Sequence, residues 1–173
     1  EPQASAALDA GDPTGDLEEV HTPDCKSIED VCAFWKKDQG SKLKPQNMLK
    51  TLVYRADDKW LVAVVRGDHD LNEGKLKGAA GAQELQMAEE ADAQAAGFAI
   101  GFVGPHVGQA DAIYVDPDAA VDQFWVTGAN KVDYHVKHFH WQRDVLDRAD
   151  PARVVVADIR NAVDGDPSPR SEG

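Results

Sequence analysis

An uninterrupted apolar run that ends in a dense polar stretch constrains the fold of this chain most. Residues 61–65 have the sequence LVAVV, and residues 66–73, which follow at once, have the sequence RGDHDLNE. A continuous run rich in β-branched residues predicts a buried strand. The polar residues therefore begin where a core strand ends, and binding residues are often found on loops at such places.

The length and the ends of the chain bound its domain organisation. With 173 residues it is long enough for one well-buried domain and too short for two comfortable ones. Residues 1–21 lack periodicity and predict a flexible acidic linker, residues 22–169 predict the folded domain, and residues 170–173 predict a flexible tail. The chain begins without Met and ends on polar, proline-rich sequence, so we expect a piece of a longer protein.

Composition predicts a cytoplasmic protein without a membrane anchor. No apolar run approaches the roughly 18–20 residues needed to cross a bilayer, and no signal peptide is visible. Cys25 and Cys32 match no zinc-binding spacing, and two cysteines make no disulfide framework. We therefore expect reduced thiols and a cytoplasmic location.

The net charge of −13 argues against a nucleic-acid partner, but its distribution weakens that argument. Residues 1–30 contain nine acidic residues and one basic residue, a balance of −8, so the rest of the chain carries −5. Basic clusters remain within residues 36–50 and 131–143, and each fits a solvated surface as well as a nucleic-acid contact. Charge alone leaves the partner open.

The pattern of apolar and turn-forming residues predicts a mixed α/β domain around one largely antiparallel sheet with short surrounding helices. A helix is expected after the N-cap Ser27, with Asp30 in the capping-box position, and another over residues 84–96. Residues 97–108 should lack regular structure, and residues 117–121 should form a helical turn. Strands are expected at residues 51–56, 60–65, 112–115, 124–126, 134–139 and 154–157, the first two as a hairpin.

Three places carry residues suited to binding or catalysis. Residues 101–105 (GFVGP) predict a bent loop whose amides can form a nest for an anion or a carbonyl oxygen, although a structural turn explains the same residues. Lys50 precedes a strand beside a polar loop and can hold a phosphate or carboxylate, or lie in solvent. Residues 128–130 (GAN), the third place, are turn formers that follow a strand.

Three histidines follow this third motif. His135, His138 and His140 invite a metal site, but strand alternation puts His138 and His140 on one face and His135 on the other. No cysteine or second cluster completes a site, so no metal is expected. His135 remains open as a general acid, base or positioning group. The chain has no Gly-x-Ser-x-Gly elbow, so a hydrolase of this sequence would use water as its nucleophile.

Several short motifs occur in one order along the chain. They are KTL at 50–52, RGDHDLNE at 66–73, GFVGP at 101–105, GAN at 128–130, WQRD at 141–144, ADIRN at 157–161 and GDPSP at 165–169. In this order they closely resemble the editing insertion domain of bacterial prolyl-tRNA synthetases, within the YbaK superfamily of aminoacyl-tRNA deacylases. The resemblance covers roughly residues 22–169 and implies the α/β fold of that family.

The resemblance implies hydrolysis of alanine wrongly esterified to tRNA(Pro). A pocket that admits proline cannot strongly exclude the smaller alanine, so a second site must remove the product. The family uses no metal, cofactor or enzyme nucleophile for editing, and the terminal ribose hydroxyl helps to activate water; ATP and Mg would belong to the parent synthetase. The implied partners are the acceptor end of tRNA(Pro) and the rest of a prolyl-tRNA synthetase, which would be homodimeric.

The resemblance also assigns roles to residues. Lys50 matches the lysine that contacts the acceptor end, and His135 matches the histidine that positions the aminoacyl group, so both are expected in catalysis. Residues Phe124-Trp125 and His140-Trp141 depart from the family pattern, which predicts a changed pocket wall. The expected substrate-binding residues are Gly101, Phe102, Val103, Gly104, Pro105, Gly128 and Asn130.

Two other functions fit the same sequence. One is a free-standing deacylase of the same superfamily, which acts in trans on alanyl or cysteinyl esters of tRNA(Pro). The other is a module that docks tRNA without hydrolysing it. Substitution of His135 separates these functions, because hydrolysis should fall in an enzyme while docking should barely change.

Overall fold

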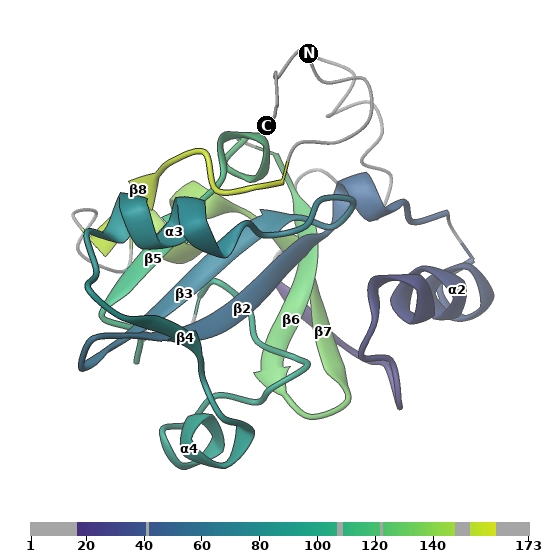
Figure 1. Cartoon of the computed structure of the whole chain (residues 1–173). Coiled ribbons are helices and arrows are strands. Elements are labelled where there is room, and N and C mark those ends of the chain that lie inside the picture. Colours follow the sequence, from purple (N-terminus) through teal and green to yellow (C-terminus); the bar gives the residue numbers. More distant parts are fainter. Residues whose placement is uncertain (1–16, 41, 107–108, 122, 148–152, 162–173) are drawn as a thin grey trace.

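The strands form two sheets in a computed structural model that describes residues 17–40, 42–106, 109–121, 123–147 and 153–161 (Figure 1). One sheet has three antiparallel strands in the order β1-β7-β6, and the other has five in the order β4-β2-β3-β5-β8. The strands are β1 (Glu18–His21), β2 (Leu49–Ala56), β3 (Lys59–Arg66), β4 (Leu85–Met87), β5 (Ala112–Val115), β6 (Trp125–Lys131), β7 (Tyr134–Phe139) and β8 (Val154–Val156).

Short helices surround these sheets, as the sequence predicts. Figure 1 shows α3 and α4 at opposite ends of the five-stranded sheet and α2 to one side. No helix in the described residues is long and apolar enough to span a membrane. The helices are α2 (Ile28–Asp38), α3 (Glu73–Ala80) and α4 (Glu90–Ala95), with the 3₁₀ turns η1 (Pro45–Asn47) and η2 (Pro117–Ala119) and the π-helical turn η3 (Gln142–Leu146).

The apolar run of residues 61–65 lies in β3, at the centre of the five-stranded sheet. β3 pairs antiparallel with β2 on one side and parallel with β5 on the other. Val62 and Val64 pack into one core cluster, whereas Ala63 and Val65 pack into another. Side chains of a strand alternate between its two faces, so burial on both sides explains why this run has no polar positions. The predicted hairpin and buried strand are confirmed.

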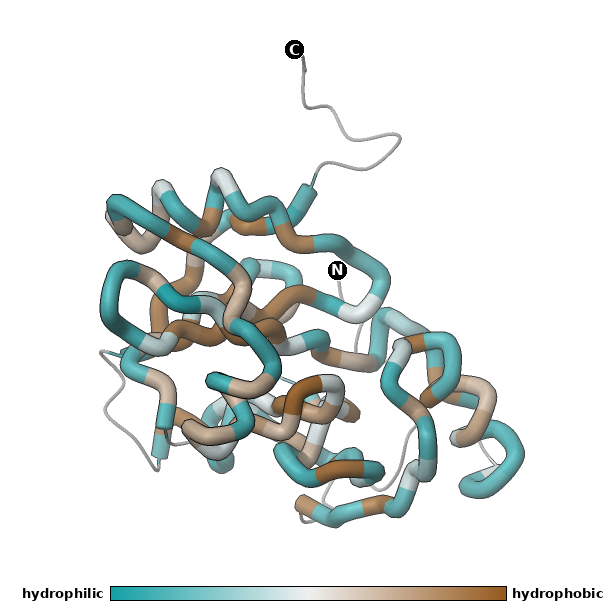
Figure 2. Tube along the Cα trace, turned by 60° about the horizontal axis from the view of Figure 1, so that its bottom comes forward, coloured by the Kyte–Doolittle hydropathy of each residue, from teal (hydrophilic) through white to brown (hydrophobic). Residues whose placement is uncertain are grey.

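Three apolar clusters stabilise the fold, and the tube in Figure 2 shows apolar segments gathered inside a mostly hydrophilic outer trace. The largest joins both sheets, another packs α3 and Ile159 against the five-stranded sheet, and the third lies beneath α2. In α2 the predicted cap is confirmed, because the Ser27 side chain accepts a hydrogen bond from the backbone N–H of Asp30. Val31 and Trp35 are the buried residues of this helix.

Tertiary pairing overturns several local expectations. The mixed α/β class is confirmed, but the strands form two sheets instead of one. The helix expected over residues 84–96 is wrong: β4 pairs with the free edge of β2, and only Glu90–Ala95 is helical. The Asp57 carboxylate accepts hydrogen bonds from the N–H groups of Gln83 and Glu84, which directs this segment along the edge. Edge pairing thus outweighs the helix propensity of the segment.

The boundary of the expected linker also moves. Residues 18–21 form β1, which pairs with β7 and so belongs to the folded part of the chain. Residues 128–130, expected as a turn, lie inside β6, where the register with β7 is irregular. Residues 1–16, 107–108 and 162–173, which include the tail expected at 170–173, lie outside the described residues.

A helix that the sequence analysis leaves unassigned follows the polar stretch. The Asn72 side chain caps the first turn of α3 by accepting a hydrogen bond from the N–H of Lys75. Gly81 ends the helix in the left-handed conformation, with φ of +63°. Leu76 is its buried residue, so the helix has too narrow an apolar face to be detected by periodicity.

Two glycines allow the 102–104 backbone to pack directly against β6. A Cβ added to Gly104 would collide with the carbonyl oxygen of Gly128, and one added to Gly128 would collide with the carbonyl group of Phe102. Real Cβ atoms do not approach backbone this closely, so both positions require glycine. The loop and β6 can therefore lie in direct backbone contact.

We expect Gly128→Ala to lower the free energy of unfolding by about 1–3 kcal/mol or more, because the new methyl group must displace backbone. Gly78→Ala is the matched control, since an added Cβ at this exposed helical position meets no atom within 4 Å. It should raise stability by up to about 1 kcal/mol, because alanine favours helix. Urea denaturation of both variants measures the difference, and equal stabilities would contradict the prediction.

Candidate functional site

A cleft of about 730 Å³ lies where the two sheets, α2 and the glycine loop of residues 101–105 meet. Its wall contains five of the nine residues that the sequence analysis selects. The other lining residues include the first residues of α2, the apolar Met48 and Met87, and the acidic Asp68 and Asp70. The five predicted residues are Lys50, Gly101, Val103, Gly128 and His135.

His135 enters the cleft from β7 and is only 5% exposed. Its Nδ1 lies 2.7 Å from Oγ1 of Thr22, which is fully buried. The ring of Phe102 packs edge-on against the imidazole, with 5.9 Å between the ring centroids. Burial lowers the pKa of His135 to about 4, because desolvation disfavours the charged ring. His135 is therefore neutral at pH 7, where it can donate or accept hydrogen bonds but adds no positive charge.

Lys50 lies at the start of β2, opposite Val65 of β3. Its Nζ is 3.2 Å from Oδ1 of Asp70, with 27% of the Lys50 side chain and 81% of the Asp70 side chain exposed. An ion pair with one such exposed partner stabilises the fold by roughly 0–1 kcal/mol. A ligand can therefore separate the two side chains at little cost to the fold.

The loop of residues 101–105 divides into a part that lines the cleft and a part that supports it. Gly101 and Val103 line the cleft, and Gly101 has a φ of +92° that side chains rarely tolerate. Phe102 is buried, and its N–H donates to the carbonyl of Ala99, so this amide is not available to a ligand. Gly104 packs against β6. Pro105 is buried and is not among the described residues that line the cleft. The amide nest expected from the sequence is thus smaller than five residues.

Asn130 braces the same loop and lies outside the described lining of the cleft. Its N–H donates to the carbonyl oxygen of Phe102 at 2.6 Å. Its side chain accepts from the N–H of Ala99 and donates to the carbonyl of Gly97. Its positive φ of 58° is one that asparagine adopts more readily than most residues. Asn130 therefore connects β6 to the start of the glycine loop and to the residues that precede it.

Hydrogen bonds hold the polar stretch of residues 66–73 in place. Asp68 accepts two hydrogen bonds from Arg66, at 2.6 and 2.9 Å, and this guanidinium group helps to lower the pKa of Asp68 against the opposing effect of its burial. Glu73 accepts a hydrogen bond from the hydroxyl group of Tyr54. Burial and this hydrogen bond raise the pKa of Tyr54. These contacts hold the loop from which Asp68 and Asp70 face the cleft.

Sequence reasoning missed Thr22 and Asp70. Thr22 carries no local signal, because its partner His135 is 113 positions away in the chain. Asp70 lies in the polar stretch, but only the fold brings it to Lys50. The expected change of the pocket wall at residues 124–125 is not seen: Trp125 is buried in the main core, and neither residue is among the described lining residues.

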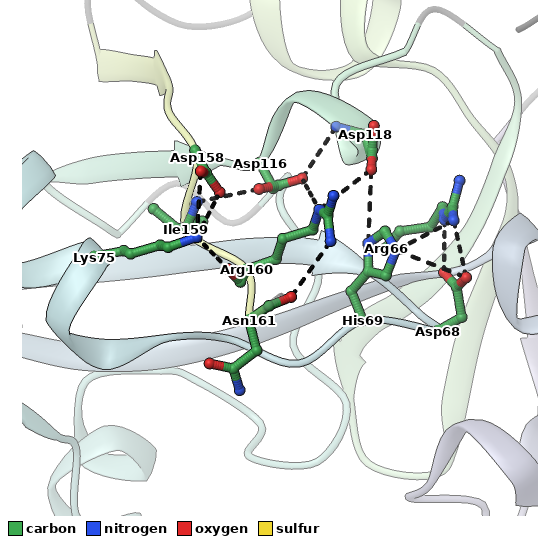
Figure 3. A network of polar contacts seen from close by, with 10 residues as sticks. All are labelled: Arg66, Asp68, His69, Lys75, Asp116, Asp118, Asp158, Ile159, Arg160 and Asn161. Carbon is green, nitrogen blue, oxygen red and sulfur yellow. Dashed lines mark hydrogen bonds and ion pairs between the residues drawn. The ribbon is translucent and has the colours of Figure 1, made fainter. Parts of the chain in front are cut away.

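The three histidines of residues 135–140 do not gather at one point. His138 and His140 both pack against the ring of Phe124, whereas His135 packs against Phe102. A different group, His69 with Asp116 and Asp118, has ligand atoms within 4.8 Å of one another (Figure 3).

The His69 group is filled by guanidinium groups. Arg160 Nε lies 3.4 Å from the Asp118 carboxylate. Arg66 Nη2 lies 3.3 Å from Nε2 of His69, and arginine can only donate, so this ring nitrogen accepts. The Asp116 carboxylate accepts from the N–H groups of Asp118 and Ile159. The guanidinium groups already supply the positive charge that a metal ion would bring, which favours a structural network.

The family model for the aminoacyl-tRNA editing domain matches residues 22–145. The match begins at Thr22, the hydrogen-bond partner of His135, and includes every residue that lines the cleft. The chain belongs to the aminoacyl-tRNA editing domain family. Proline–tRNA ligases are similar to this editing domain in sequence. The ligase of Dehalococcoides mccartyi is 40% identical over 163 residues, which are 94% of this chain and 26% of the ligase. That of Geotalea daltonii is 42% identical over 173 residues, which are 99% of this chain and 28% of the ligase.

The resemblance to editing domains of prolyl-tRNA synthetases is therefore confirmed, and the chain spans about a quarter of the length of these relatives. Two crystal structures share the fold of the editing domain. A protein proposed to be a trans-editing enzyme for prolyl tRNA synthetase has a TM-score of 0.65 at 22% identity, covering 94% of this chain and 99% of that one. A hypothetical protein has a TM-score of 0.66 at 18% identity, covering 84% and 92%.

The low pKa of His135 predicts a pH dependence of stability. The unfolded chain has the ordinary histidine pKa of about 6.5, so it binds this proton more tightly than the folded chain does. Neutral His135 therefore contributes fully to the free energy of unfolding above about pH 6.5. This contribution, up to about 3 kcal/mol, is lost as the pH falls toward about 4. Urea unfolding should show a steeper loss between pH 6.5 and 4 in the wild type than in His135→Gln. Parallel curves for the two proteins would contradict this assignment.

Proposed function

We propose that this editing domain removes alanine wrongly esterified to tRNA(Pro), through attack of water on the aminoacyl ester. The observation that carries the proposal is one cleft in which a neutral histidine, a lysine and a glycine loop meet, in a chain of the aminoacyl-tRNA editing family. Identity of about 40% to proline–tRNA ligases favours tRNA(Pro) as the acceptor. Editing is needed because a proline site cannot strongly exclude alanine.

The size of the cleft suits more than an alanyl group. A volume of about 730 Å³ is in the range of pockets that hold a drug-sized ligand, so we infer that it holds the terminal nucleoside together with its ester. The apolar residues Ile28, Val31 and Met48 line one part of it and suit a small side chain. Lys50 and Lys26 line it as well and suit the anionic backbone at the acceptor end.

His135 positions the ester in this proposal. When the Thr22 hydroxyl donates to Nδ1, the ring proton is on Nε2, and a neutral donor faces the substrate. The backbone amides of Gly101 and Val103, two residues of the cleft lining, polarise the ester carbonyl, which gains negative charge as water attacks. Water is the nucleophile, and the terminal ribose hydroxyl helps to activate it. The domain needs no cofactor, and ATP and Mg belong to the ligase activity of a parent synthetase.

The partners proposed for the domain are the acceptor end of tRNA(Pro) and the rest of a prolyl-tRNA synthetase. The ligase relatives support this assembly, because they contain a segment similar to nearly all of this chain. The likeness to a proposed trans-editing enzyme concerns the fold alone, so a free-standing deacylase is the second candidate. Homodimerisation of the synthetase and a cytoplasmic location stay predictions.

We expect the wild-type domain to hydrolyse Ala-tRNA(Pro) at least about tenfold faster than Pro-tRNA(Pro), measured as the loss of labelled amino acid from each ester. His135→Gln should lower kcat for the alanyl ester about tenfold or more, because one positioned hydrogen-bond partner is lost. His21→Gln is the control, since His21 lies at the exposed end of β1 and outside the described cleft lining.

Equal loss of both esters, or no loss above buffer, would contradict the proposed function. Unchanged binding of tRNA(Pro) with no hydrolysis by the wild type would instead support the docking module. Hydrolysis of Cys-tRNA(Pro) in preference to the alanyl ester would support the second deacylase. An editing domain within a synthetase and a free-standing deacylase would both hydrolyse the ester in this way, and they would differ in the rest of the protein.

A further inference from the structure

Asp70 occupies the position beside Lys50 that an anionic ligand would need. Its Oδ1 lies 3.2 Å from Nζ of Lys50, and its side chain is 81% exposed. Both residues line the cleft. An exposed carboxylate on a surface loop gains little from such a pair, and the lysine it neutralises is one of the two in the described lining.

The backbone at Asp70 is fixed, although its side chain is exposed. The carbonyl of Asp70 accepts a hydrogen bond from the N–H of Asn161 at 2.8 Å. The next residue, Leu71, forms an antiparallel bridge with Arg160. Figure 3 shows how this C-terminal segment is itself held, with Lys75 contacting Asp158 and the carbonyl of Arg160. The loop therefore keeps Asp70 near Lys50, and only the carboxylate can turn away.

The charges on the cleft wall make this pair important. Lys26 and Lys50 are the basic residues of the described lining, and Glu29, Asp68 and Asp70 are the acidic ones. Asp68 is neutralised by Arg66 through two hydrogen bonds. Asp70 is thus the acid in direct contact with a cleft lysine. A phosphate that approaches Lys50 meets repulsion from Asp70 and must replace it.

We propose that Asp70 is a built-in counter-ion at a phosphate-binding position formed by Lys50, and that a backbone phosphate of the tRNA acceptor end displaces it. This rests on the proposed function, because it assigns the ligand of the same cleft. Asp70 lowers the affinity for nucleic acid in general. Only a ligand that gains other contacts in the cleft then displaces it readily.

The test measures binding of uncharged tRNA(Pro) to the 173-residue chain by fluorescence anisotropy, at about 0.05 M and about 0.5 M KCl. Asp70→Asn keeps the shape of the side chain and removes its charge. We expect the dissociation constant to fall about three- to tenfold at low salt, and the gain to shrink at high salt because screening weakens the repulsion. Hydrolysis of Ala-tRNA(Pro) is measured in parallel.

Asp58→Asn is the matched control. It removes the same charge from an exposed turn at the opposite end of the β2–β3 hairpin, and the carbonyl that contacts Arg55 is kept. Its affinity should stay within about twofold of the wild type, because the site lies beyond a Debye length from Lys50. In the Lys50→Ala background, Asp70→Asn should give no further gain, because the proposed interaction is with Lys50.

Several outcomes would overturn the inference. Unchanged affinity of Asp70→Asn, an equal gain from Asp58→Asn, or a gain that persists in the Lys50→Ala background would each do so. Weaker binding of the variant would overturn it as well, because the Asp70 carboxylate would then assist binding instead of opposing it. The two measurements separate failure of this inference from failure of the proposed function. The inference depends on the affinity of Asp70→Asn relative to the wild type, and the proposed function depends on hydrolysis by the wild type.

Discussion

Burial of β3 on both faces is the constraint on which the rest of the structure depends. One face supplies Val62 and Val64 to the core between the sheets, and the other supplies Ala63 and Val65 to the core beneath α3. Both neighbours of β3 must then be strands, and both faces must be covered. When β3 ends at Arg66, the chain leaves the core with its polar groups at one edge. This exit directs Gly67, Asp68 and Asp70 to the wall of the cleft.

The second sheet closes the cleft through backbone contact. Gly104 and Gly128 let the glycine loop lie directly against β6, and Asn130 ties β6 to Ala99 and Gly97. β7 pairs with β6 and carries His135, while Thr22, which follows β1, forms a hydrogen bond with Nδ1 of that histidine. Three parts of the chain that are distant in sequence thus converge: β1 with Thr22, the glycine loop and the β6–β7 pair. Larger side chains at Gly104 and Gly128 would prevent the backbone contact between the loop and β6.

The two titratable residues expected in catalysis have opposite environments. His135 is buried, neutral and held by a hydroxyl group, so it can position a substrate without changing charge near pH 7. Lys50 is partly exposed and paired with an acid that solvent reaches easily, so its charge can be redirected to a ligand. One residue supplies fixed geometry, and the other supplies a charge that can be exchanged, which suits the proposed binding of an ester attached to an anionic nucleic acid.

Local pattern and motif order were enough to predict the class of the fold, the β2–β3 hairpin, the capped start of α2 and the family. It also selected five residues that meet in the cleft. Three features emerge from the folded chain instead: residues 85–87 form an edge strand, residues 18–21 belong to a sheet, and His135 and Lys50 have Thr22 and Asp70 as their partners. These features depend on contacts between segments up to 113 positions apart, for which local propensity carries no information.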